Sequence, residues 1–317
     1  MNGTPPQIEI IAPFRAAFEW MKSVLFRPFD VAKWLTIAFA AFIGGNIGGG
    51  GGGNFSRIGR LGNGDWKYRT TSHGNWPSDW NITPWLIALI VIGVLVFLVI
   101  AIVWAWVSAR GRFIFTDCVV KNRGAIGEPW REYRREGNSF FLFWLAIGFV
   151  SLILAGIVAA ILVSLFRMGD FNEPGPSVAF IIVLVLAILV WVMVAVFLTI
   201  VAHFMVPVMY RRRCTAREAF ADVLNLILRN PGPIILFVLF MIVLAIGVGV
   251  VGTMVACLTC CIGGLPYIST VLLLPAIVWL AAYRLFFLRQ FGDQYDVWAS
   301  AATSAPAPLP SPPAPPV

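Results

Sequence analysis

Charged side chains are scarce in this chain. They make up 12% of its 317 residues, whereas soluble domains usually carry about one-quarter. Hydrophobic residues reach 59%, the mean hydropathy is +0.85, and one charge-free stretch runs from Trp80 to Ala109. A run of about 20 apolar residues spans the hydrocarbon core of a bilayer. The composition therefore argues against an ordinary soluble domain and predicts an all-α, polytopic integral membrane protein.

Acidic residues are missing from every predicted span. We expect six transmembrane helices, near residues 31–47, 84–108, 140–165, 178–209, 233–258 and 267–287, and none contains Asp or Glu. Ion-coupled transporters and pumps usually carry carboxylates within the membrane. The absence argues against coupled transport, although a passive pathway remains open.

Histidine is also rare, with only His73 and His203 in the chain. Zinc sites usually need three or four clustered ligands, and no H-E-x-x-H, Walker or Gly-x-Ser-x-Gly pattern is visible in the spans. Ser139 has no histidine that the sequence places beside it. We therefore predict no enzyme activity, no catalytic or cofactor-binding residue and no metal. His203, within a span, is read as hydrogen-bonded to a neighbouring helix or, alternatively, as a proton relay.

The five cysteines do not define a redox site. Cys257, Cys260 and Cys261 form a C-x-x-C-C at the predicted outer end of the fifth span. A disulfide is possible on an oxidising outer side, but small buried hydrophobic residues are the favoured interpretation. Cys118 and Cys214, on the other side, are expected to be packing residues.

Basic residues gather in every second connection, which sets the orientation. The net charge is +8, and most Lys and Arg precede span one, separate spans two and three, separate four and five, or close span six. The positive-inside rule then places both termini in the cytoplasm of a bacterium, with the chain in the inner membrane. Anionic lipid headgroups explain these charges better than nucleic acid, which is not expected as a partner.

A similar unit is used three times along the chain. Short amphipathic helices are predicted near 14–26, 129–136 and 216–229, each before a hairpin of two spans, with a Thr215–Glu218 capping box opening the third. The units end alike, at Phe113-Ile114-Phe115, Phe204-Met205-Val206 and Leu285-Phe286-Phe287. We infer three parallel repeats, although any even-spanning protein with basic inner loops looks periodic. The short helices either lie on the membrane or pack against the bundle.

Two segments differ in composition from this membrane domain, which is assigned to residues 1–299. The outer loop 44–83 opens with glycines and then holds four Trp and Tyr residues. It is expected to be a flexible linker, with a lip that binds lipid or sugar as the alternative. The Pro/Ala-rich tail, 300–317, is expected to be disordered and cytoplasmic.

One element of the pattern resembles a known family. Pro207-Val208-Met209-Tyr210, then Ala219-Phe220, then Asn230-Pro231 opening a span, is similar to the membrane domain of some bacterial glycerophosphodiester phosphodiesterases. Uncharacterised polytopic proteins share that architecture. The resemblance covers Phe14–Phe291 and implies a six-span helical domain. It carries over no catalytic residue, because the soluble phosphodiesterase barrel is absent.

The sequence therefore favours a non-enzymatic integral membrane protein that acts in envelope organisation or binds a membrane protein partner. The alternative is a passive or lipid-handling transporter, with a path between the units lined by residues such as Ser151, Ser164, Thr199 and Thr253. An intramembrane enzyme is the least favoured reading. A polar, water-wide centre would favour transport, and a dry, packed centre would favour the structural role.

Overall fold

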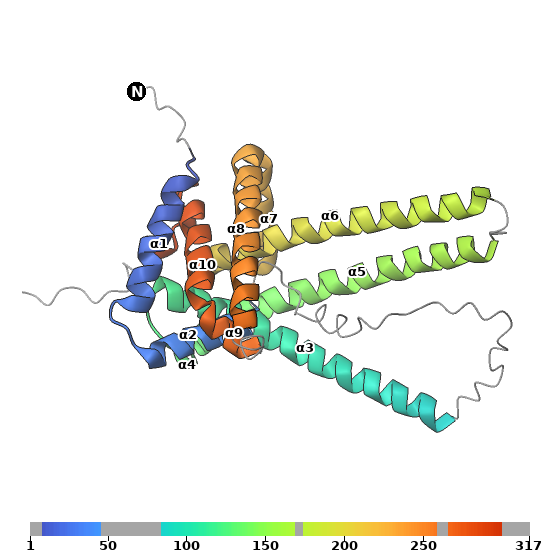
Figure 1. Cartoon of the computed structure of the whole chain (residues 1–317), viewed down its shortest axis with the longest axis horizontal. Coiled ribbons are helices and arrows are strands. Elements are labelled where there is room, and N and C mark those ends of the chain that lie inside the picture. Colours follow the sequence, from blue (N-terminus) through green and yellow to red (C-terminus); the bar gives the residue numbers. More distant parts are fainter. Residues whose placement is uncertain (1–7, 46–83, 169–173, 259–265, 300–317) are drawn as a thin grey trace, which may run out of the picture.

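The long apolar helices share one buried core at one of their ends. The computed structural model describes residues 8–45, 84–168, 174–258 and 266–299, and every regular element in these ranges is helical. Helices α3 (Pro84–Val120), α5 (Arg134–Met168) and α6 (Pro174–Arg212) extend from the core to one side (Figure 1). Helix α8 (Pro231–Leu258) runs across their direction. The prediction of three parallel repeats is therefore not confirmed.

Four helices in the described residues are long and apolar enough to cross a membrane. Their candidate spans are Ile87–Val120, Arg134–Leu165, Phe180–Arg212 and Pro231–Val255. Large apolar side chains remain exposed along them; Leu152, for example, is 70% exposed. Soluble monomers rarely expose apolar patches of this extent, whereas hydrocarbon would solvate them. The prediction of an all-α membrane protein is therefore confirmed, with four candidate spans.

The first predicted span, 31–47, is not confirmed. Helix α2 (Val31–Ile43) has 13 residues, a length of about 20 Å, which is less than the hydrocarbon thickness. It begins at Asp30, whose carboxylate accepts a hydrogen bond from the Ala32 N–H at 2.8 Å. It ends at Gly44 and Gly45, the latter with φ +66°, a conformation that favours glycine. The sequence prediction extended the helix past this stop.

The sixth predicted span, 267–287, is divided into two helices. α9 (Pro266–Leu272) and α10 (Leu274–Arg289) are each shorter than a full crossing. Pro275 lies at the start of α10; it has no N–H, and its ring crowds the carbonyl of Val271, four residues earlier. The turn before α9 falls on residues 259–265, outside the described ranges.

Short helices occur in the three segments where they are predicted, and they pack on protein. α1 (Ile11–Phe26) lies along α10, α7 (Ala216–Arg229) packs on α6 and α5, and the one-turn α4 (Gly127–Glu132) packs on α3. In α7 the Glu218 carboxylate accepts from the Thr215 N–H at 3.1 Å, which confirms the capping box. All three short helices thus contact the bundle, which is one of the two placements left open by the sequence. A 3₁₀ turn, Asp293–Tyr295, follows α10.

Helix α5 passes through Gly137 and Asn138, although Gly and Asn are residues at which helices often end. A side chain at Gly137 would place Cβ 2.9 Å from Cγ of Arg110. The Asn138 side-chain oxygen accepts from Arg110 Nη2 at 2.9 Å and from Trp106 Nε1 at 3.0 Å. Tertiary contacts with α3 thus explain both residues, and they override the local tendency to stop the helix.

Candidate functional site

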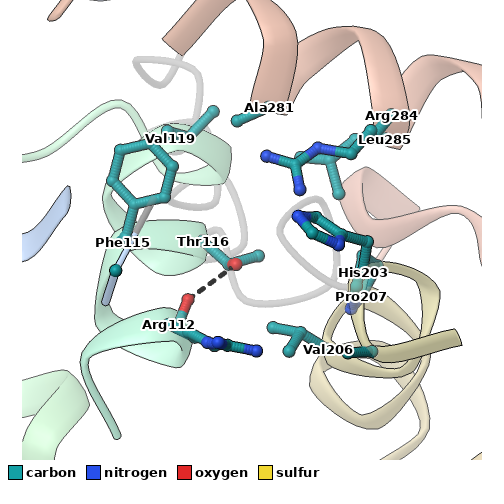
Figure 2. A pocket seen from close by; sticks show the side chains of 12 residues that line it. Arg112, Phe115, Thr116, Val119, His203, Val206, Pro207, Ala281, Arg284 and Leu285 are labelled. Atoms are coloured by element: carbon teal, nitrogen blue, oxygen red, sulfur yellow. Dashed lines mark hydrogen bonds between the residues drawn. The ribbon is translucent and has the colours of Figure 1, made fainter. Parts of the chain in front are cut away.

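A small cavity lies where α3, α6 and α10 meet. These three helices, here called the exit helices, each end one of the predicted units, and they contact one another pairwise. The cavity measures about 50 Å³, room for roughly four water molecules. Its lining consists of Gly45, Arg112, Phe115, Thr116, Val119, Ala202, His203, Val206, Pro207, Ala281, Arg284 and Leu285 (Figure 2).

Arg112 enters the cavity from α3 beside the end of α2. The approach of the two helices requires Gly111, since a Cβ there would lie 2.6 Å from Ile43 Cγ2 and 2.7 Å from Gly44 N. The Arg112 Nε donates to the Gly44 carbonyl oxygen at 3.2 Å, and Thr116 Oγ1 donates to the Arg112 carbonyl at 2.8 Å (Figure 2). The remaining guanidinium N–H groups of Arg112 have no hydrogen-bond partner among the described residues.

His203 enters from α6, and its hydrogen bond is made within its own helix. Its Nδ1 lies 2.7 Å from the Thr199 carbonyl oxygen. Because that carbonyl can only accept, we assign the proton to Nδ1, which leaves Nε2 for the cavity. The predicted bond to a neighbouring helix is not found among the described residues. Pro207, four residues on, has no N–H, so the His203 carbonyl also lacks its helical donor.

Arg284 enters from α10 next to His203 (Figure 2). Its Nε donates to the Leu280 carbonyl of its own helix at 3.3 Å. Within the described ranges, neither Arg284 nor Arg112 has a carboxylate within salt-bridge distance, although nine such pairs involve other residues. Both arginines are partly buried. Among the residues that the structure describes, no acidic group therefore compensates these two positive charges of the cavity, and burial strongly disfavours such charges.

These three residues occupy matching positions in the predicted units. Arg112 precedes Phe113-Ile114-Phe115, His203 precedes Phe204-Met205-Val206, and Arg284 precedes Leu285-Phe286-Phe287. The three triplets are recognisable in the sequence, and the basic residue before each one is the signal that could have identified these three residues. That the three side chains meet follows only from the contacts among the exit helices.

A carboxylate joins the exit helices beside the cavity. Asp117 is fully buried, and it accepts from the Tyr210 hydroxyl at 3.0 Å, from Arg123 Nη2 at 2.9 Å and from Lys121 Nζ at 2.8 Å. Tyr210 stacks on Tyr133 with ring centroids 4.9 Å apart. This carboxylate has all its partners, so it ties α3 to α6 and is not available to a ligand.

Other residues singled out in the sequence lie elsewhere. Ser139 Oγ accepts from the Ala216 N–H at 3.0 Å and so caps the start of α7. The hydroxyls of Ser164, Thr199 and Thr253 donate to carbonyls of their own helices, and neither they nor Ser151 line the cavity.

The cysteine and metal predictions are tested only in part. Cys118, Cys214 and Cys257 are free, and Cys257 is exposed rather than buried. Cys260, Cys261 and His73 lie outside the described residues. No group of three or more His, Cys, Asp or Glu in the described part of the chain could hold a metal ion.

The fold and composition define an all-α membrane protein with four candidate spans and a basic cavity between its exit helices. The chain belongs to DUF7544, a family of unknown function whose sequence pattern matches residues 9–295. That match covers every helix described above. No curated protein and no solved structure matches the chain.

Proposed function

We propose that this is a non-enzymatic integral protein of a bacterial cytoplasmic membrane, which acts in envelope organisation or binds a membrane protein partner. The observation that carries the proposal is the separation of the molecule into a tightly packed, basic end and long, exposed apolar helices. Arg211 and Arg212 close α6, with Arg213 directly after it, and Arg134 and Arg135 open α5 at the same packed end (Figure 1). This charge distribution supports a cytoplasmic position for that end, with anionic headgroups around it.

We further propose that the protein consists of three units with six hydrophobic crossings, of which the 13-residue α2 is the shortest and requires local thinning of the bilayer. In support, each short helix packs on the exit helix of the unit before it: α4 on α3, α7 on α6, and α1 on α10, which closes the series. α9 and α10 together extend from Pro266 to Arg289, about 36 Å if fully helical. The divergent direction of α8 means that the units are not geometric copies. The similarity to phosphodiesterase membrane domains remains a hypothesis about this arrangement.

Lipid handling is the second candidate, and the cavity between the exit helices favours it. The cavity contains three basic side chains but is small, and much of the surrounding core is packed with buried side chains such as Phe113, Phe204 and Phe287. Lipid handling is therefore not proposed on the basis of a continuous, water-wide path. For this reason we prefer the binding role to transport.

Reconstitution decides between the two candidates. Full-length protein in vesicles with a fluorescent phospholipid would be treated with a membrane-impermeant quencher, beside protein-free vesicles. We expect about half of the fluorescence to be quenched in both samples, because only the outer leaflet is accessible. Quenching well beyond half in the protein sample alone would refute the non-transporting role and support lipid handling.

A further inference from the structure

We propose that the cavity between the exit helices binds a phosphate-bearing anion, held by the guanidinium groups of Arg112 and Arg284 with His203 as the third contact. This inference goes beyond the proposed function, because it holds whether or not the protein moves lipid. It names the ligand chemistry, a phosphate group, which either a lipid headgroup or a soluble phosphate anion can supply.

The positive charges that line the cavity support an anion site. Arg112 and Arg284 both line this small cavity, together with His203 (Figure 2). The buried charges elsewhere in the described chain have partners: Asp117 has two cationic partners, and Glu136 lies 3.7 Å from Arg213. Buried Arg110 has no carboxylate partner among the described residues, but it donates to Asn138 and lies over the Trp106 ring. Two partly buried guanidinium groups that lack a counter-ion in the described part of the chain are costly. An anion in the cavity between them would remove that cost.

The hydrogen-bond donors of the two arginines are also arranged for an anion. Each arginine uses its Nε on a carbonyl, Gly44 for Arg112 and Leu280 for Arg284. These bonds fix the side chains and leave the terminal N–H groups for a ligand. Guanidinium groups suit phosphate because parallel N–H donors match two of its oxygens. The His203 Nε2 can accept from a phosphate hydroxyl when the ring is neutral, or donate to a phosphate oxygen when it is charged.

The size and the position of the cavity also fit a phosphate group. A cavity of about 50 Å³ suits a single phosphate-sized group, not a whole headgroup. The cavity lies toward the C-terminal ends of α3, α6 and α10, where Arg211, Arg212 and Arg289 also lie. In the proposed orientation this is the level of headgroup phosphates in the cytoplasmic leaflet.

Binding by the wild-type protein is the first test. Full-length protein, purified in maltoside detergent and freed of phospholipid, would be titrated with radiolabelled inorganic phosphate at constant ionic strength. A parallel sample would be titrated with phosphatidylglycerol, and a third with a galactolipid that lacks phosphate, with bound lipid counted by native mass spectrometry. Saturable binding of phosphate, of phosphatidylglycerol or of both supports the site and identifies its source. Binding of neither, or equal binding of the galactolipid, overturns it.

Paired charge removal locates the binding. Arg112→Gln with Arg284→Gln removes two charges from the cavity, and Arg15→Gln with Arg217→Gln removes two from exposed positions. We expect the first pair to weaken binding at least about a hundredfold, since each arginine contributes charge-assisted hydrogen bonds. The second pair should change binding less than about threefold. Equal effects of the two pairs would overturn the assignment.

Unfolding separates a ligand site from a structural role. In phosphate-free detergent, the cavity pair should unfold at the wild-type temperature or higher, because it loses two unpaired charges. Added phosphate should raise the midpoint of wild-type protein and leave that of the pair unchanged. If the pair does not fold, Arg112→Lys with Arg284→Lys retains the charges without the forked donors and should bind at least about tenfold more weakly. Wild-type-like binding by this second pair would contradict the proposal.

Discussion

The indole Nε1 of Trp34 donates a hydrogen bond to the Val271 carbonyl oxygen, 3.2 Å away and from a segment 237 residues distant. Pro275 cannot provide the helical N–H for this carbonyl, so a side chain of α2 replaces it. The bond explains how the break between α9 and α10 is accommodated, and it fixes α2 against α9.

Removing this donor should destabilise the protein. For Trp34→Phe we expect the free energy of unfolding to fall by about 1–3 kcal/mol, because the carbonyl is left without a partner while most of the ring packing remains. Trp85→Phe is the matched control, since Trp85 is 65% exposed, and it should change stability by less than about 0.5 kcal/mol. Denaturant unfolding in detergent measures both. Equal losses would show that the hydrogen bond is not the cause.

The close approach of α2 and α3 depends on Gly111. Gly111→Ala should cost about 1–3 kcal/mol, since its Cβ would fall 2.6 Å from Ile43 Cγ2. Gly93→Ala, in the same helix, has nothing within 4 Å of the added carbon and should be neutral or stabilise by up to about 1 kcal/mol. If the two variants unfold together, the crossing of α2 and α3 is not as described.

Buried Asp117 should matter more than an exposed acid. For Asp117→Asn we expect a loss of about 3 kcal/mol, because Lys121 and Arg123 lose a charged partner at a fully buried position. Asp222→Asn breaks a partly exposed pair with Arg212 and should cost less than about 1 kcal/mol. Thermal unfolding of the two variants, monitored by circular dichroism, provides the comparison, and a larger loss for Asp222→Asn would contradict it.

Cys214 should react slowly with alkylating reagents. Burial raises the pKa of this thiol, which lies just after α6. A raised pKa means that less thiolate, the reactive form, is present at any pH below it. In a variant that retains only Cys214, the maleimide reaction at pH 8 should be slower than in the urea-unfolded chain, and its rate should keep rising above pH 9. A rate already constant by pH 8 would refute the shift.

The four longest spans are predictable from the sequence because each is an unbroken apolar run. A helix that faces hydrocarbon needs little more than sufficient length and apolar side chains. The other two depended on single residues. Gly45 with its positive φ ends α2 early, and Pro275 divides the last helix. Helix α3 also continues to Val120, well past the predicted end at 108. In this extension Arg110 donates a hydrogen bond to Asn138, and Arg112 donates one to the Gly44 carbonyl oxygen. The charge pattern alone places both arginines in a loop.

The cavity could not be predicted from the sequence. Arg112, His203 and Arg284 come from three separate helices, and only the packing of the exit helices brings them together. Their common position before three similar triplets was the available sign. Ser139 illustrates the opposite outcome: its role as the cap of α7 depends on a contact across 77 residues that no local motif encodes.

The most direct test of the account is the side of the membrane on which the packed, basic end lies. Single-cysteine variants Glu19→Cys, Glu128→Cys, Arg217→Cys and Asp293→Cys, in a background without native cysteines, place a label site in or beside each inner segment. Ser72→Cys reports the predicted outer loop. In intact cells a membrane-impermeant maleimide should label Ser72→Cys alone, and the other four should react only after permeabilisation. Labelling of any of those four in intact cells would contradict the three-unit arrangement and the placement of the cavity at the cytoplasmic surface.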